Sequence, residues 1–148
     1  MRAVVQKVSH ASVAVDGETL GSIGQGLLVF LGIAPEDTDE DLKYLVKKIT
    51  QLRIFEDAQD KMNLALADVG GALLVISQFT LFADTRKGNR PSFVKAGPPD
   101  FSKAMYLKFI KACRDLGYTC EEGEFGAHME VSLLNDGPVT IIIDTKER

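Results

Sequence analysis

Residues Gly26 to Leu52 read GLLVFLGIAPEDTDEDLKYLVKKITQL, and two different hydrophobic periods follow each other within this segment. Leu27–Leu31 is a continuous apolar run, which predicts a β-strand buried on both faces and ended by Pro35. The apolar residues that follow recur at spacings of three and four, which predicts one stripe of an amphipathic α-helix: Leu42, Leu45, Val46, Ile49 and Leu52. Either Asp37 or Thr38 is suited to cap the start of this helix.

Toward the N-terminus the pattern is that of a β protein. Val4, Val5 and Val8 mark a first strand, and Ser12–Val15 alternates polar with apolar residues. Asp16-Gly17 follows before Glu18–Leu20, and this dipeptide between two strand-like segments predicts a tight hairpin.

Toward the C-terminus a second buried strand is predicted at Ala72–Ile76, after the break at Gly70-Gly71. A second helix is predicted with Asp100 as its cap and Gly117 as its end. Its apolar face consists of Phe101, Met105, Phe109, Ala112, Cys113 and Leu116.

The last segment predicts another hairpin. Met129, Val131 and Leu133 alternate with polar residues, Asn135–Pro138 forms a tight turn, and Val139–Ile143 returns as a strand. Together these elements predict one α+β domain over residues 1–148, with mainly antiparallel β-sheets and two α-helices packed against them.

Composition excludes several classes of protein. With 45% hydrophobic and 26% charged residues in 148, the chain is neither a disordered tail nor a collagen-like repeat nor a disulfide scaffold. No apolar run approaches the roughly 18 residues that a membrane span needs, so no membrane partner is expected. The N-terminus lacks the pattern of a signal peptide, and we expect a cytoplasmic protein.

The few metal-binding side chains do not form a pattern. Cys113 and Cys120 are seven residues apart, which matches no zinc motif and favours buried thiols. His10 and His128 each stand without a specified partner, which favours structural roles. The sequence therefore predicts neither a metal site nor a cofactor.

Two segments are unusual for purely structural strands. Ser77-Gln78-Phe79-Thr80 follows directly on an aliphatic strand, and its polar groups must find partners or face a cleft. A strand that merely leaves the core remains the alternative. Asp136-Gly137-Pro138 places a proline, which has no N–H, where a hairpin strand would return. The exposed carbonyls of this turn could act as a rigid probe, or the turn could be merely tight.

Both segments resemble the motifs of a known family, the D-aminoacyl-tRNA deacylases, also called D-tyrosyl-tRNA deacylases. The motifs are Ser77–Leu81 and Asn135–Thr140, and neither departs from the family pattern. The resemblance continues through Arg53-Ile54-Phe55, Lys61-Met62-Asn63 and Arg90-Pro91-Ser92-Phe93. It covers essentially the whole chain in order.

The resemblance implies an enzyme that hydrolyses the ester between a D-amino acid and the terminal adenosine of tRNA, and that works as a homodimer. Catalytic residues Ser77, Gln78, Phe79 and Thr80 would line the pocket of one subunit. A cis Gly137–Pro138 bond would reach in from the other subunit and reject L-aminoacyl-tRNA. Phe125 would flank the adenine, with Met129 close by.

Two reaction routes are compatible with these residues. The Thr80 hydroxyl could attack the ester, but the sequence specifies no adjacent base to activate it. Alternatively, the ribose 2′-hydroxyl of the substrate could activate water, while the backbone N–H groups of Phe79 and Thr80 stabilise the oxyanion. We favour the second route because the base is missing. A filter that works by excluding an L side chain should also let glycyl-tRNA pass.

The net charge of −4 argues against binding nucleic acid over the whole surface, although a local basic patch can still hold the acceptor end of tRNA. The best cluster is Arg86, Lys87, Arg90 and Lys95, and Lys7 and Lys47-Lys48 are lesser options. Two rival functions remain open: a non-catalytic RNA-binding dimer, and a general esterase with Thr80 as nucleophile.

Overall fold

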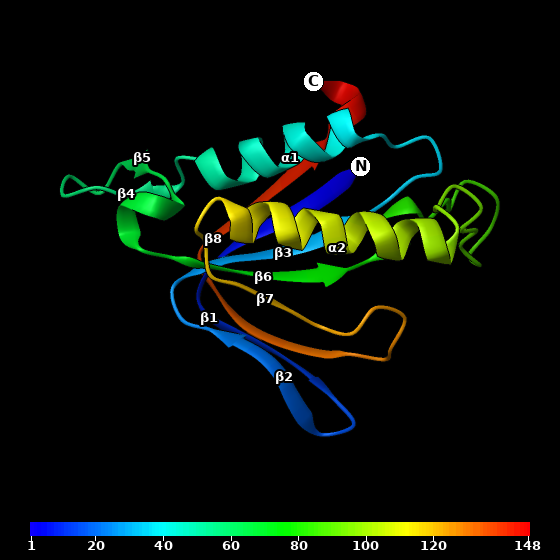
Figure 1. The fold of residues 1–148 in the computed structure, drawn as a ribbon, viewed down its shortest axis with the longest axis horizontal. Helices are drawn as coiled ribbons and strands as arrows, with labels where there is room; N and C mark the ends of the chain where they lie inside the picture. Colours follow the sequence, from blue (N-terminus) through cyan, green and yellow to red (C-terminus); the bar gives the residue numbers. More distant parts are fainter.

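One long strand, β1 (Arg2–Val15), organises the main sheet of the computed structural model, which describes all 148 residues (Figure 1). It pairs antiparallel with β2 (Glu18–Ile23), β3 (Gly26–Gly32) and β8 (Glu130–Asp144). From β3 the sheet continues through β6 (Ala72–Ser77) and β7 (Cys120–Glu122), each parallel to the strand before it. A separate two-stranded sheet joins β4 (Phe55–Glu56) to β5 (Met62–Leu64).

Two helices, α1 (Asp39–Gln51) and α2 (Pro99–Asp115), lie on one face of this sheet (Figure 1). Three single-turn 3₁₀ helices complete the chain: η1 (Leu66–Val69), η2 (Phe79–Phe82) and η3 (Thr145–Glu147). The architecture is a single α+β domain with mainly antiparallel pairing, as predicted. No helix of the fold has the length and apolar character needed to cross a membrane.

The core has two parts. Alternate residues of β1 and β3, such as Val5 and Val29, pack with the apolar stripes of both helices in the larger cluster. The smaller cluster lies on the other face, where Val13, Leu28 and Leu74 meet partly buried residues of β8. The run Leu27–Leu31 is therefore buried on both faces, which confirms the prediction from its continuous apolar sequence.

Helix α1 begins and packs as predicted. Its N-cap is Thr38, whose backbone N–H and hydroxyl both donate to the carboxylate of Asp41, over 2.9 and 3.0 Å. The apolar stripe at Leu42, Leu45, Val46 and Ile49 is buried.

Helix α2 begins earlier than the sequence predicted. Pro98 is the N-cap and Pro99 the first helical residue, so Asp100 lies inside the first turn and is not the cap. A proline is favoured at the first helical position because its missing N–H would have no partner there. Gly117 follows the end of the helix with φ +94°, as expected for a terminating glycine.

The predicted C-terminal hairpin is wrong. β8 does not reverse at Asn135–Pro138, because the segments on both sides of it pair with β1 in the same direction. Between the pairs Gln6–Thr140 and Val8–Asn135, one residue of β1 faces four residues of β8. Asp136–Pro138 therefore protrudes from a continuous strand, and we call these three residues the β8 protrusion.

The side chain of Asn135 closes the base of the β8 protrusion. Its Oδ1 accepts the backbone N–H of Val139 over 3.2 Å, and its Nδ2 donates to the Thr140 hydroxyl over 3.1 Å. The Gly137–Pro138 peptide bond is cis, and Gly137 has φ +137°, a conformation that favours glycine.

Candidate active site

A cavity of about 620 Å³ opens where β3 and β6 end and α2 begins. Leu31 and Ser77 are register partners on these parallel strands, so both strands deliver their last residues to the same place. The chain after β3 contributes Ile33 and Pro35 to the wall. This is the edge at which parallel strands commonly bind ligands.

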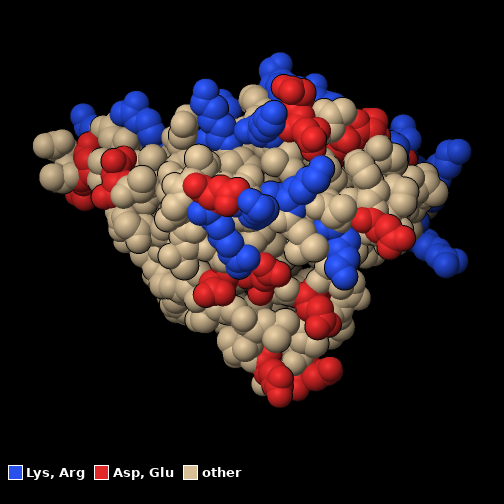
Figure 2. Space-filling view, viewed as in Figure 1, with Lys and Arg blue, Asp and Glu red and all other residues tan.

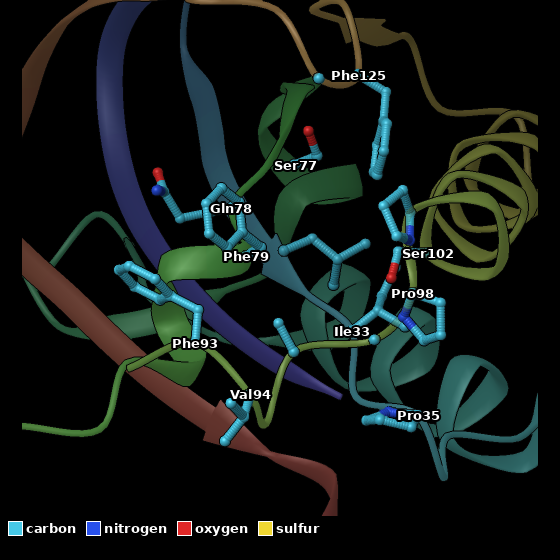
Figure 3. Close-up of a pocket in the computed structure, with 15 residues that line it drawn as sticks. Ile33, Pro35, Ser77, Gln78, Phe79, Phe93, Val94, Pro98, Ser102 and Phe125 are labelled. Carbon is cyan, nitrogen blue, oxygen red and sulfur yellow. The ribbon is translucent and has the colours of Figure 1, made fainter. Parts of the chain in front are cut away.

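Three residues of the first motif line the cavity: Ser77, Gln78 and Phe79 (Figure 3). β6 ends at Ser77, the Gln78 N–H still donates to the Leu31 carbonyl over 2.8 Å, and η2 then turns the chain. Phe79 remains 59% exposed and packs edge-on against Phe93, with ring centroids 5.1 Å apart. Two polar residues of the motif, Ser77 and Gln78, thus line a cleft, which is one of the two interpretations of the sequence.

Thr80 lies beside the cavity and is not part of its wall. Its hydroxyl accepts a hydrogen bond from the side-chain amide of Gln78. The N–H groups of Phe79 and Thr80 open η2, where a helix offers its first donors no internal acceptor. These two N–H groups are the candidate oxyanion donors.

Phe125 lines the cavity from a segment far along the chain, and its ring centroid is 6.0 Å from that of Tyr106. Met129 is not in the wall. It packs against the smaller core cluster, close to Gly123. Phe125 therefore shares the cavity wall with the motif residues, whereas Met129 packs behind it, against the cluster that contains Ile76.

Sequence reasoning missed the opposite wall, which the segment from Phe93 to Ser102 forms. Gly97-Pro98-Pro99 leads this segment into α2, and this run of glycine and prolines was the one feature of the sequence that could have indicated the wall. Ser102 is the one buried side chain whose polar atom lacks a hydrogen-bond partner. Figure 3 shows it with Pro98 on the side of α2.

The cavity wall contains no Asp, Glu, His, Lys, Arg, Cys or Tyr. Its side-chain polar groups are the hydroxyls of Ser77 and Ser102 and the amide of Gln78. No group of three His, Cys, Asp or Glu side chains in the chain is placed to hold a metal ion. The wall can therefore orient a substrate and donate hydrogen bonds, but it offers no general base from its own chain.

The second motif does not reach this cavity within one chain. The β8 protrusion faces Lys7, whose partner on β3 is Leu27, whereas the cavity begins at Leu31. That difference of four residues corresponds to about 13 Å along the strand, and β1 also lies between β8 and β3. The structure of one chain leaves the two motifs apart.

The predicted basic cluster is partly neutralised. Arg86 forms an ion pair with Asp84 at 2.6 Å, and Lys95 approaches the same carboxylate at 3.5 Å. The hydrogen bonds from Arg86 hold the pKa of Asp84 well below its usual range. Lys87 and Arg90 form no ion pair and are exposed on this loop, whose ends are joined by the bridge between Asp84 and Ser92.

Lys7, a lesser candidate for RNA binding, is not available for that role. Its side chain is only 7% exposed, and its Nζ lies 4.0 Å from carboxylates of Glu56 and Asp136. The register shift opposite the β8 protrusion places it beneath that protrusion and not on the surface.

Residues 4–144 match the model of the family described as "D-Tyr-tRNA(Tyr) deacylase". A protein of Thermosipho africanus (strain TCF52B) named "D-aminoacyl-tRNA deacylase" is 54% identical over 147 residues, covering 99% of both chains. One of the same name from Fusobacterium nucleatum subsp. nucleatum is 58% identical, covering 99% of this chain and 97% of the relative.

A solved structure has the same fold over nearly its whole length. It is described as "c-Myc DNA Unwinding Element Binding Protein", and it matches with a TM-score of 0.91 and 42% identity. The match covers 97% of this chain and 98% of that one.

Proposed function

Since this chain belongs to the D-Tyr-tRNA(Tyr) deacylase family, we propose that it hydrolyses the ester bond of D-aminoacyl-tRNA at a site shared between two subunits. The chain is a D-aminoacyl-tRNA deacylase and thus a hydrolase. The products are a free amino acid and tRNA. The observation that carries the proposal is one cavity, lined by Ser77, Gln78, Phe79 and Phe125, to which the second motif of the same chain does not extend.

The proposed dimer accounts for the separation of the two motifs. β8 pairs only with β1, so its outer edge is free along 15 residues. Ile142 and Leu134 stand exposed on this strand, at 72% and 47%. An unpaired edge with apolar side chains favours association with another chain. In the proposed dimer, each β8 protrusion completes the cavity of the other subunit.

Selection against L-aminoacyl-tRNA is assigned to the carbonyl groups of Gly137 and Pro138. Backbone carbonyls held in a strand cannot move aside as a side chain would. If they occupy the space that an L side chain needs, the L substrate collides with them, whereas a D side chain points elsewhere. Gly137 suits this position, because a Cβ added there would lie 2.7 Å from the side chain of Val139.

The proposed reaction uses the substrate's own reactivity. An aminoacyl ester is already activated, and a wall without a general base must supply orientation and oxyanion donors. The N–H groups of Phe79 and Thr80 serve as donors, and the ribose 2′-hydroxyl activates the attacking water. Thr80 and Gln78 hold each other in position through their hydrogen bond.

The acceptor end of tRNA lies in the cavity, with the adenine beside Phe125. Lys87 and Arg90, the unpaired cations of the nearby loop, contact the RNA backbone at that end. The proposal places the reaction in the cytoplasm, where aminoacyl-tRNA is used in translation. Protection of correct L-aminoacyl-tRNA there depends on the filter.

The decisive experiment compares the hydrolysis of one tRNA charged with the D or the L form of the same amino acid. We expect the purified chain to release D-amino acid rapidly and to leave the L ester at its spontaneous rate. A chain that hydrolyses neither is a binding protein. Equal hydrolysis of both would identify a general esterase, and either outcome contradicts the proposal.

Glycyl-tRNA tests how the filter works. Glycine has no side chain to collide with the Gly137 and Pro138 carbonyls, so we expect its ester to be hydrolysed alongside the D ester. A missing methyl in a loose pocket costs only about 1–3 kcal/mol. The measurement uses free glycyl-tRNA at catalytic enzyme concentration, with L-alanyl-tRNA as control. Inertness toward glycyl-tRNA would mean that the pocket recognises the D side chain itself.

A further inference from the structure

A second groove, of about 400 Å³, lies at the C-terminal end of α1, away from the cavity. It is lined by the last two turns of this helix and by the residues that follow, namely Tyr44, Lys47, Lys48, Gln51, Leu52 and Arg53. Figure 2 shows several Lys and Arg side chains along the edge of the molecule that α1 occupies in Figure 1, with Asp and Glu side chains among them. We call these six residues the α1 groove.

The lysines of the α1 groove are not neutralised. Lys47 and Lys48 are exposed and form no ion pair, although the chain as a whole carries a net charge of −4. The acidic residues of α1 are confined to its first turn, at the opposite end. Two exposed lysines on α2, Lys108 and Lys111, differ from them, because they pair with carboxylates at 3.3 and 2.8 Å.

The groove also holds an arginine in a fixed position. Arg53 donates from Nε to the Asn63 carbonyl over 2.8 Å and from one terminal nitrogen to Asn63 Oδ1 over 3.0 Å. A guanidinium has five donors, so three remain free to bind a partner without further ordering of the side chain.

An aromatic ring completes the groove. Lys48 Nζ lies 5.6 Å from the centroid of Tyr44, and the guanidinium of Arg148 lies 4.8 Å from the same centroid. Cations on both the helix and the C-terminal residue are thus gathered around one ring. Arg148 also approaches Asp41 at 4.0 Å, whereas the two lysines of the α1 groove remain unpaired. Two unpaired lysines and the fixed Arg53 in one groove are complementary to a polyanion that presents charges in series.

We propose that the α1 groove binds the phosphate backbone of the duplex acceptor arm of the tRNA whose 3′ end occupies the cavity. This inference rests on the proposed function. Pro35, four residues before α1, lines the cavity, and the groove lies at the far end of the helix. A helix of 13 residues spans about 20 Å, so the groove lies beyond the reach of the terminal nucleotide. Double-stranded RNA is bound mainly through its phosphates and 2′-hydroxyls, which cationic side chains can contact.

The test replaces both groove lysines, Lys47→Ala with Lys48→Ala, and measures steady-state hydrolysis of D-aminoacyl-tRNA at several salt concentrations. We expect KM at low salt to rise about tenfold while kcat stays unchanged, since two phosphate contacts are lost. The slope of log(kcat/KM) against log salt should become less steep by about two. The matched control, Lys108→Ala with Lys111→Ala, removes the same charge from α2 and should leave KM and the slope near the wild-type values.

Two further measurements separate RNA binding from a structural role of the lysines. A D-aminoacyl ester of adenosine alone lacks the duplex, and both forms of the enzyme should hydrolyse it equally. The charge-preserving change, Lys47→Arg with Lys48→Arg, should restore the wild-type KM for tRNA. The affinity for an acceptor-stem RNA hairpin that carries no amino acid, measured by fluorescence anisotropy, should fall in the double alanine variant and return in the double arginine variant.

Three results would overturn the inference: an unchanged KM and salt slope for tRNA, an equal loss with the adenosine ester, or an equal loss in the α2 control. A wild-type chain that hydrolyses neither D ester contradicts the proposed function. The affinity for the acceptor-stem hairpin then tests RNA binding by the α1 groove separately, because this measurement does not depend on hydrolysis.

Discussion

Thr80 decides between the two reaction routes. Its hydroxyl accepts a hydrogen bond from Gln78, and the residue lies outside the cavity wall. In the proposed reaction, Thr80 contributes only its backbone N–H and this contact. Thr80→Val keeps the shape and the N–H and removes the hydroxyl. We expect kcat to fall by about tenfold or less, because Gln78 loses a partner but no nucleophile is lost.

The control for this prediction is Thr80→Ser, which keeps a hydroxyl and should retain most of the activity. Loss of a covalent nucleophile would instead lower kcat by about three orders of magnitude or more in a folded protein. That result, together with a trapped acyl-enzyme, would establish the direct attack by Thr80.

Gly26 lies at the other end of β3 from the cavity, and it matters for steric reasons. A Cβ added there would stand 1.9 Å from the carbonyl oxygen of Ala72, its partner on β6. We expect Gly26→Ala to lower the free energy of unfolding by at least about 3 kcal/mol and Tm by roughly 10 °C. Gly24→Ala is the matched control for urea and thermal denaturation, since no atom lies within 4 Å of its Cβ position. Similar stabilities of the two variants would contradict the steric argument.

At the scale of elements, the start of α1 should make stability depend on pH. Burial alone would raise the pKa of Asp41, but hydrogen bonds from the Thr38 N–H, Thr145, the Thr38 hydroxyl and Lys146 outweigh it and hold the pKa below its usual range. Because the folded-state pKa is lowered, this contribution is present above the ordinary carboxyl pKa, about 4, and is lost as the pH falls toward the folded value.

The corresponding variant is Asp41→Asn. We expect a loss of about 1–2 kcal/mol at pH 7, because the cap of α1 and the contact to Lys146 are weakened. The difference from the wild type should shrink as the pH falls below about 4. Asp39→Asn, at an exposed position in the same turn, should change stability little. If the difference in free energy of unfolding between Asp41→Asn and the wild type does not vary with pH, the pH dependence does not arise from the lowered pKa of Asp41.

The two Asp-Gly dipeptides show how far local sequence predicts an element. Asp16-Gly17 reverses the chain as predicted, with φ of +50° and +81° at the two positions. Asp136-Gly137 does not, because only its glycine has a positive φ and a proline without an N–H follows. β1 is long enough to pair with β8 on both sides of the protrusion, and this pairing keeps β8 from reversing at Asp136-Gly137. The residues near the dipeptide do not indicate a pairing with a strand so far away in the sequence.

At the scale of the molecule, the proposed shared site predicts complementation between subunits. Gln78→Ala alters the cavity, and Pro138→Ala alters the β8 protrusion, so each homodimer should be nearly inactive. Random mixing of the two inactive forms yields heterodimers in which one of two sites is intact, so about a quarter of the wild-type activity should return. The measurement needs unfolding and refolding of the mixture, with each parent refolded alone as control. Mixtures as inactive as their parents would exclude a shared site.

The candidate site was predictable only in part from the sequence. The resemblance identified Ser77–Phe79 and Phe125, which the fold places in one cavity. The wall from Phe93 to Ser102 was not predicted, because its contact with the end of β3 depends on how α2 packs over the sheet. Met129 packs against the smaller core cluster. The alternation of apolar and polar residues from Met129 to Leu133 predicts a buried face but does not indicate which of the two clusters that face joins.

The shape of β8 also bears on how the protein avoids fibrils. A free strand edge of 15 residues is a template onto which further chains can add without limit. The β8 protrusion divides this edge into two shorter rows of donors and acceptors, and a flat strand from another molecule cannot follow it past the interruption. The insertion that we propose as a filter for substrates would, by the same geometry, restrict growth along the sheet to a closed pair of subunits.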